Sequence, residues 1–140
     1  MREMEPEQFR KYGHEMVDWI ANFMINIEKY TVSPDIKPGE IKAQLPKNAP
    51  TKGENMDDIF KDFKKIILPG ITHGQHPCWF AYFPANNSPP SILGELLTAG
   101  LGAQCMIWKT SPAAEELEEV TLEWLRKMVD LPEGMTGVIQ

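Results

Sequence analysis

The stretch HGQHPCWFAYFP, residues 73–84, gathers many of the side chains in this sequence that could do chemistry. His73 and His76 lie three residues apart and Cys78 follows them, which is a spacing that metal ligands can use. A closed zinc site needs four ligands, however, and the rest of the sequence adds only His14 and Cys105. The sequence therefore disfavours a metal centre.

The second half of this stretch offers a different chemistry, because it is rich in aromatic rings. Prolines stand on both sides of it, and proline breaks helices and favours an extended backbone. Side chains of an extended chain alternate between two faces, so one face could fill a core while the other lines a cavity for an aromatic ligand. Residue chemistry alone favours packing in a core. The rings belong to Trp79, Phe80, Tyr82 and Phe83.

Other kinds of site lack support in the sequence. It contains no GxSxG elbow, no phosphate-binding P-loop and no GxGxxG turn. The glutamate pairs Glu115–Glu116 and Glu118–Glu119 are predicted to form the solvated face of a helix. The formal net charge is -6 and no dense run of Lys and Arg occurs, which argues against a nucleic-acid surface. We expect a cytoplasmic protein with reduced cysteines, without a signal peptide or a membrane span.

The elements that must position these residues are predicted to be mostly α-helical, with about four helices joined by extended connections. The first helix is expected over residues 7–28, with an apolar stripe that repeats every seven residues from Phe9. Trp19, Met24 and Ile25 fall outside this stripe and give the helix more apolar surface than one short partner would cover. The candidates for covering it are later helices of this chain or a second copy of the protein.

Local signals place the remaining helices. Residues 31–53 hold four prolines and allow at most a helical turn near residues 39–45. A second helix is predicted over residues 56–68, with Asn55 as its cap. The third and fourth helices are predicted to begin with the Ser-Pro pairs at residues 88–89 and 111–112, with the serine as the cap and the proline at the first helical position. Val138 and Ile139 look like the start of a further element, so the sequence is expected to be the front part of something longer.

Four long segments together carry a resemblance to a known family. They are FRKYGHEMVDWIANF, HGQHPCWFAYFP, SPPSILGELLTAGLG and WKTSPAAEELEEVTLEWLRKMVDLPEG, in that order. They resemble the pyridoxal-phosphate-dependent group II amino-acid decarboxylases, closest to the aromatic-L-amino-acid decarboxylases, over essentially the whole chain. The resemblance implies the α/β fold-type I architecture of PLP-dependent transferases for the parent protein. It also implies an N-terminal helical dimerisation region with the pocket-lining segment at residues 1–86, and the start of the PLP-binding domain at residues 87–140.

The resemblance also implies a substrate pocket, whose last two residues come from a loop of the neighbouring subunit. It implies no catalytic, cofactor-binding or metal-binding residue within these 140 residues. The family's Schiff-base lysine follows a histidine, and none of the three histidines here precedes a lysine. Pyridoxal 5'-phosphate (PLP) is therefore expected to be bound by residues beyond Gln140, and the chain alone is expected to be inactive. The implied substrate-binding residues are Tyr82, Phe83, Pro84, Ala85, Gln104 and Met106.

The expected function is that of the N-terminal part of a homodimeric carboxy-lyase, which releases CO2 and an amine from aromatic L-amino acids. Gly74, Ala85, Gln104 and Met106 depart from the residues usual in the family, which enlarges the pocket or makes it more polar and leaves the exact amino acid open. Two alternatives stand beside this function. One is a stand-alone helical dimerisation module without catalysis, and the other is a decarboxylase of glutamate type. No nucleic-acid or membrane partner is expected.

Overall fold

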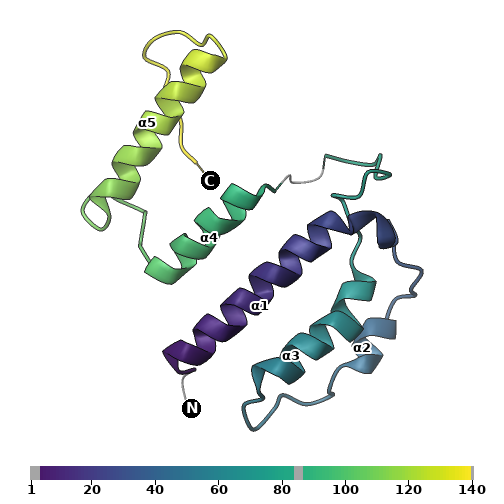
Figure 1. Ribbon diagram of the computed structural model, residues 1–140. Coiled ribbons are helices and arrows are strands. Elements are labelled where there is room, and N and C mark those ends of the chain that lie inside the picture. Colours follow the sequence, from purple (N-terminus) through teal and green to yellow (C-terminus); the bar gives the residue numbers. More distant parts are fainter. Residues whose placement is uncertain (1–3, 84–86, 140) are drawn as a thin grey trace. The chain divides into compact units, whose positions relative to one another are not determined.

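The structure is a computed structural model that describes residues 4–83 and 87–139 (Figure 1). These residues form α-helices and short helical turns, without a strand, as the sequence predicted. The chain divides into two compact units, residues 1–86 and 87–140. The functional roles predicted for the two regions stay predictions.

The first unit is built on a pair of neighbouring helices, α1 and α3 (Figure 1). Helix α1 spans Pro6–Ile25 and is followed by a 3-10 turn at Ile27–Lys29. Helix α3 spans Met56–Asp62 and continues through a π-helical turn, Phe63–Ile67, into a 3-10 turn, Leu68–Gly70. The Asn55 side chain accepts a hydrogen bond from the backbone N–H of Asp58 at 2.9 Å, which confirms the predicted cap.

Aromatic rings join α1 to α3. Trp19 stacks on Phe23 at 5.4 Å between ring centroids and meets Phe60 and Phe63 edge-on at 5.8 and 5.3 Å. Trp19 therefore lies in the packed face, although the sequence analysis placed it outside the main stripe. Phe9, the first residue of the predicted stripe, is 62% exposed. The position of α3 decided which face of α1 is covered, and a single helix pattern does not contain that information.

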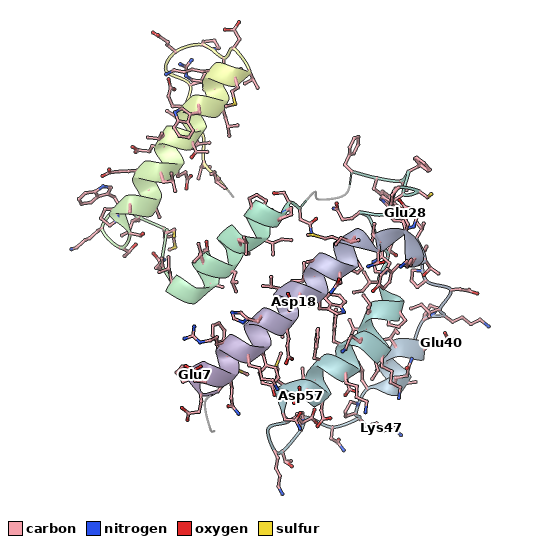
Figure 2. All side chains as sticks on the ribbon, in the orientation of Figure 1. Glu7, Asp18, Glu28, Glu40, Lys47 and Asp57 are labelled. Atoms are coloured by element: carbon pink, nitrogen blue, oxygen red, sulfur yellow. The ribbon has the colours of Figure 1, made fainter. Side chains whose placement is uncertain are left out.

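The same helix pair is tied by a polar contact near the start of α3. The Tyr12 hydroxyl donates to Oδ2 of Asp57 at 3.0 Å, and Figure 2 labels Asp57 at this point. This hydrogen bond raises the pKa of Tyr12, because the neutral phenol is the form that donates to the carboxylate.

The proline-rich connection packs on the turns that follow α3. It contains one short helix, α2, at Glu40–Gln44, where the sequence allowed a helical turn. Gly39, with φ of 96°, precedes α2 in a left-handed conformation that glycine adopts without steric cost. Gly70 lies under Ile41, because a Cβ at residue 70 would come within 3.0 Å of that side chain.

The second unit holds the helices α4, Pro89–Leu101, and α5, Pro112–Met128. The Ser88 hydroxyl accepts from the backbone N–H of Ser91 at 3.3 Å, which confirms the predicted cap of α4. The matching prediction for α5 is wrong, because the Ser111 side chain makes no capping hydrogen bond among the described residues. With ψ of 81°, Ser111 departs from the extended geometry of a capping residue, and only its carbonyl accepts, from Glu115 N–H.

Residues 129–139 run back along α5. The Ile139 N–H donates to Oε1 of Glu118 at 2.9 Å, and Nη1 of Arg126 donates to the carbonyl of Leu131. Arg126 also pairs with Glu123 through two hydrogen bonds, and these contacts together with Lys127 lower the pKa of Glu123 to about 2. Val138 and Ile139, predicted to start a further element, have neither helical nor strand conformation. No helix in the described ranges combines the length and apolar character that crossing a bilayer requires.

Candidate functional site

His73 is a packing residue of the first unit. It is 6% exposed and packs against the rings of Phe23 and Tyr30, at centroid distances of 5.5 and 5.3 Å, while those two rings also contact each other. Its backbone N–H donates to the carbonyl of Val32 at 2.9 Å. Burial lowers the pKa of His73, because a charged imidazole is poorly solvated there, and electrostatic repulsion from His76 lowers it further.

His76 shapes the turn that follows. Its Nδ1 accepts from the backbone N–H of Cys78 at 3.0 Å, so the neutral ring carries its proton on Nε2. Its carbonyl accepts from the N–H of Trp79 at 2.9 Å. In the part of the chain that the structure describes, no three His, Cys, Asp or Glu side chains gather as metal ligands. Ring packing and hydrogen bonds to neighbouring residues account for the positions of both histidines.

Tyr82 and Phe83, predicted to bind substrate, lie on the surface of the first unit, where they are 89% and 104% exposed. The predicted extended backbone is wrong here, because residues 74–78, 81 and 82 form turns and bends and Tyr82 has φ of 59°. The left-handed backbone of Tyr82 costs of the order of 1 kcal/mol or more. Because the backbone is not extended at this residue, the side chains of Tyr82 and Phe83 do not alternate between two faces. Pro84 and Ala85 lie outside the described residues.

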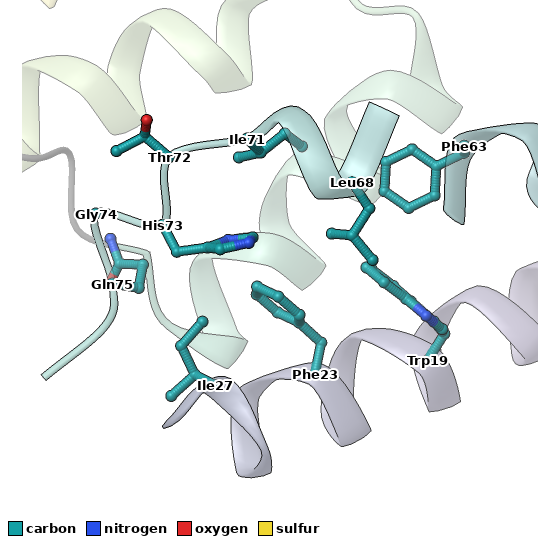
Figure 3. A pocket seen from close by; sticks show the side chains of 10 residues that line it. All are labelled: Trp19, Phe23, Ile27, Phe63, Leu68, Ile71, Thr72, His73, Gly74 and Gln75. Carbon is teal, nitrogen blue, oxygen red and sulfur yellow. The ribbon is translucent and has the colours of Figure 1, made fainter. Parts of the chain in front are cut away.

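A cavity of about 290 Å³ lies beside His73, between α1 and the segment after α3 (Figure 3). Its wall is mainly apolar, so it suits an apolar or aromatic side chain or ligand. Sequence reasoning missed this cavity, since its wall forms only when α1 and α3 pack. It is lined by Trp19, Phe23, Ile27, Phe63, Leu68, Ile71, Thr72, His73, Gly74 and Gln75.

Gln104 and Met106, the other two predicted substrate-binding residues described here, lie in the loop between α4 and α5. Oε1 of Gln104 accepts from the Met106 backbone N–H at 3.2 Å and from the Thr110 hydroxyl at 2.8 Å. The Met106 side chain is 75% exposed. The structure describes this loop within the second unit and the aromatic segment within the first.

Glu116 anchors the same loop to α5. Its Oε1 accepts from the indole Nε1 of Trp108 at 2.9 Å. The sequence analysis placed Glu116 on a solvated helix face and missed this role. Trp108 and Glu116 are eight residues apart, which is not the three- or four-residue spacing of side-chain pairs on a helix. No local sequence pattern therefore predicts the contact.

Comparison with known proteins gives these segments a context. The family described as "Pyridoxal-dependent decarboxylase conserved domain" matches residues 38–140, which is most of the chain. The chain belongs to the pyridoxal-dependent decarboxylase family.

Individual members of the family match nearly the whole chain. A phenylacetaldehyde synthase of Petunia hybrida is 46% identical over 98% of this chain and 28% of its own length. An aromatic-L-amino-acid decarboxylase of Rattus norvegicus is 45% identical over 94% of this chain and 27% of its own. The crystal structure of Catharanthus roseus tryptophan decarboxylase in complex with L-tryptophan superposes with a TM-score of 0.87 at 41% identity, covering 94% of this chain and 28% of that one. The chain thus spans less than a third of each of these proteins.

The described residues do not fit the family cofactor, pyridoxal phosphate, by themselves. Binding it requires a lysine for the aldehyde and a cradle for the phosphate. The aromatic cavity has no lysine in its wall, and neither do the two clefts along α5. One of these clefts, of about 380 Å³, is lined by Glu115, Glu118, Glu119 and Glu123, whose charges would repel a phosphate. What these residues can supply is apolar wall, exposed aromatic rings and a structured loop.

Proposed function

We propose that this chain is the N-terminal part of a PLP-dependent decarboxylase that converts aromatic L-amino acids into CO2 and an amine. The observation that carries the proposal is the family match over residues 38–140, together with relatives named for aromatic substrates. When bound, PLP acts as the electron sink for loss of the carboxylate. We place its binding residues outside this chain, because the described residues do not form a site for it.

The contribution of this chain is substrate binding. We assign Tyr82, Phe83, Pro84 and Ala85 to the wall of the substrate pocket. The almost complete exposure of the Tyr82 and Phe83 rings supports this assignment, because flat apolar surfaces that the first unit leaves uncovered can stack on an aromatic substrate. We assign Gln104 and Met106 to the pocket of the neighbouring subunit.

The proposed enzyme is a homodimer that pairs through its N-terminal helices. Helix α1 leaves apolar side chains exposed after packing on α3: Phe9 by 62%, Val17 by 43% and Ile25 by 80%. A second copy of the chain packed on α1 would remove these side chains from water. We further propose a cytoplasmic location, which suits the free, exposed thiols of Cys78 and Cys105.

The test is to express the complete open reading frame, add PLP, and assay tyrosine, dopa, tryptophan, phenylalanine and glutamate. CO2, amine and aldehyde are all measured, because one relative is named a phenylacetaldehyde synthase. We expect kcat/KM for the best aromatic acid to exceed that for glutamate at least about tenfold, since a pocket walled by aromatic rings gives a second carboxylate no cationic partner. A preference for glutamate would contradict the aromatic assignment.

The 140-residue chain serves as the matched control. We expect it to release no CO2 and to show no stoichiometric PLP absorbance. An open reading frame that stopped at Gln140 would favour the dimerisation module without catalysis instead.

A further inference from the structure

The loop between α4 and α5 determines which end of the Gln104 amide faces outward. A backbone N–H can only donate, so the side-chain atom that lies 3.2 Å from the Met106 nitrogen must be the amide oxygen. The Thr110 hydroxyl also lies 2.8 Å from this oxygen, and the backbone carbonyls of Gln104 and Ile107, each at 2.9 Å, compete for its single proton. The Met106 contact therefore sets the orientation, and it leaves the Nε2 amino group, with its two N–H donors, as the end of Gln104 directed to other partners.

The loop is held well enough to keep this orientation. The Thr110 N–H and the Ser111 N–H both donate to the carbonyl of Ile107, at 3.0 and 3.3 Å. The Trp108 indole is fixed to Glu116 on α5. Turning the amide over would set its NH2 group against the Met106 N–H and lose a hydrogen bond. Gln104 therefore presents a donor from a preorganised backbone, and its side chain is exposed.

The chemistry of an outward amide N–H distinguishes between aromatic side chains. A phenolic oxygen has lone pairs and can accept from Nε2. The indole N–H of tryptophan can only donate, and the phenyl ring of phenylalanine offers neither group. A protein donor that must be desolvated on binding disfavours a ligand that leaves it unpaired.

We propose that Nε2 of Gln104 donates a hydrogen bond to the ring oxygen of a phenolic substrate held in the neighbouring subunit. Gln104 then selects tyrosine and dopa over phenylalanine and tryptophan. The inference rests on the proposed function, which places Gln104 at that pocket. It goes further by naming the atom that recognises the substrate and the class of ring it prefers.

The test compares two variants of the full-length, PLP-loaded enzyme. Gln104→Glu keeps oxygen acceptors for Met106 and Thr110 but removes the donor, and Gln104→Met removes both functions at similar volume. We expect the ratio of kcat/KM for tyrosine to that for phenylalanine to fall at least about tenfold in Gln104→Met, through the tyrosine value, since an unpaired phenol loses about that much binding. Gln104→Glu should retain more of the ratio, because the phenol O–H can donate to its carboxylate. Gln44→Glu, on α2 of the other unit, makes the same chemical change and should leave the ratio as it is in the wild type.

The outcomes separate the inference from the proposed function. An active Gln104→Met variant that keeps the wild-type ratio would overturn the role of Gln104 and leave the decarboxylase proposal standing. A wild-type enzyme that prefers phenylalanine or tryptophan to tyrosine would overturn the inference in the same way. A wild-type enzyme inactive on every aromatic acid would overturn the proposed function and, with it, the inference. Circular dichroism and PLP absorbance establish that each variant is folded and loaded.

Discussion

Burial, rather than spacing, decides what His73 does in this protein. Its distance from His76 in sequence suits metal ligands, yet its ring packs against Phe23 and Tyr30 and is almost fully covered. Burial and His76 lower the pKa of His73 below its ordinary value of 6.5, so the neutral form is favoured in the folded state. The unfolded chain therefore binds the proton more tightly than the folded chain does.

This linkage predicts a pH dependence of stability. As pH falls through 6.5 towards the lowered pKa, the unfolded state takes up the proton first, so the free energy of unfolding decreases. His73→Phe keeps a ring against Phe23 and Tyr30 and should reduce this decrease. Urea unfolding of the full-length protein at about pH 7.5 and about pH 5.5 measures it. His14→Phe, on the exposed side of α1, is the control, and an unaltered pH slope in His73→Phe would refute the assignment.

Trp19 is the second residue whose environment sets its role. It meets three phenylalanine rings from α1 and from the helical segment after Asn55. Trp19→Ala is expected to lower the free energy of unfolding by about 3 kcal/mol, because a large aromatic side chain is lost from a packed cluster. Trp19→Phe keeps one ring and should cost less than half as much. Equal losses in both variants, measured by urea unfolding, would show that ring packing is not the source of the stability.

At the scale of elements, caps explain where the helices begin. Asn55 and Ser88 accept hydrogen bonds from the backbone N–H groups of Asp58 and Ser91, and both caps follow from a few adjacent residues. The end of the second predicted helix was less accessible to sequence reasoning. Its last turns widen into a π-helical turn at Phe63–Ile67 before Pro69, whereas the sequence predicted one regular helix to residue 68.

The cap of α3 gives a direct test at this scale. Asn55→Ala should lower the free energy of unfolding by about 1 kcal/mol, because one N–H of the first turn loses its acceptor. Asn55→Ser keeps an acceptor oxygen and should cost only a few tenths of a kcal/mol, about the difference between good capping residues. Thermal unfolding followed by circular dichroism distinguishes the two variants. A Ser variant as unstable as the Ala variant would argue against capping.

At the scale of the whole molecule, α1 leaves several apolar side chains exposed to water in a single chain. The packed side of the helix carries Tyr12, Trp19 and Phe23, while Phe9, Val17 and Ile25 stay exposed. The proposed dimer would cover these residues with a second copy, as a self-complementary contact requires.

This proposal predicts a change of oligomeric state. Val17→Arg puts a charge on the exposed apolar side of α1, and we expect it to weaken the dimer at least about tenfold, because a buried unpaired charge is costly. Asp18→Arg places the same side chain at the neighbouring residue and should have a smaller effect. Analytical ultracentrifugation of the full-length protein measures both. A Val17→Arg protein that stays as dimeric as the wild type would place the subunit contact elsewhere.

The sequence by itself determined the features that depend on near neighbours in the chain. The mostly helical class, the caps at Asn55 and Ser88, the helical turn near residues 39–45 and the family resemblance all lie in short stretches of residues. The tertiary structure alone decided that Trp19 faces α3 while Phe9 stays exposed, that His73 is buried, and that Trp108 finds Glu116. These contacts depend on where one element lies against another, and helical periodicity gives the faces of an element without naming the partner that covers them.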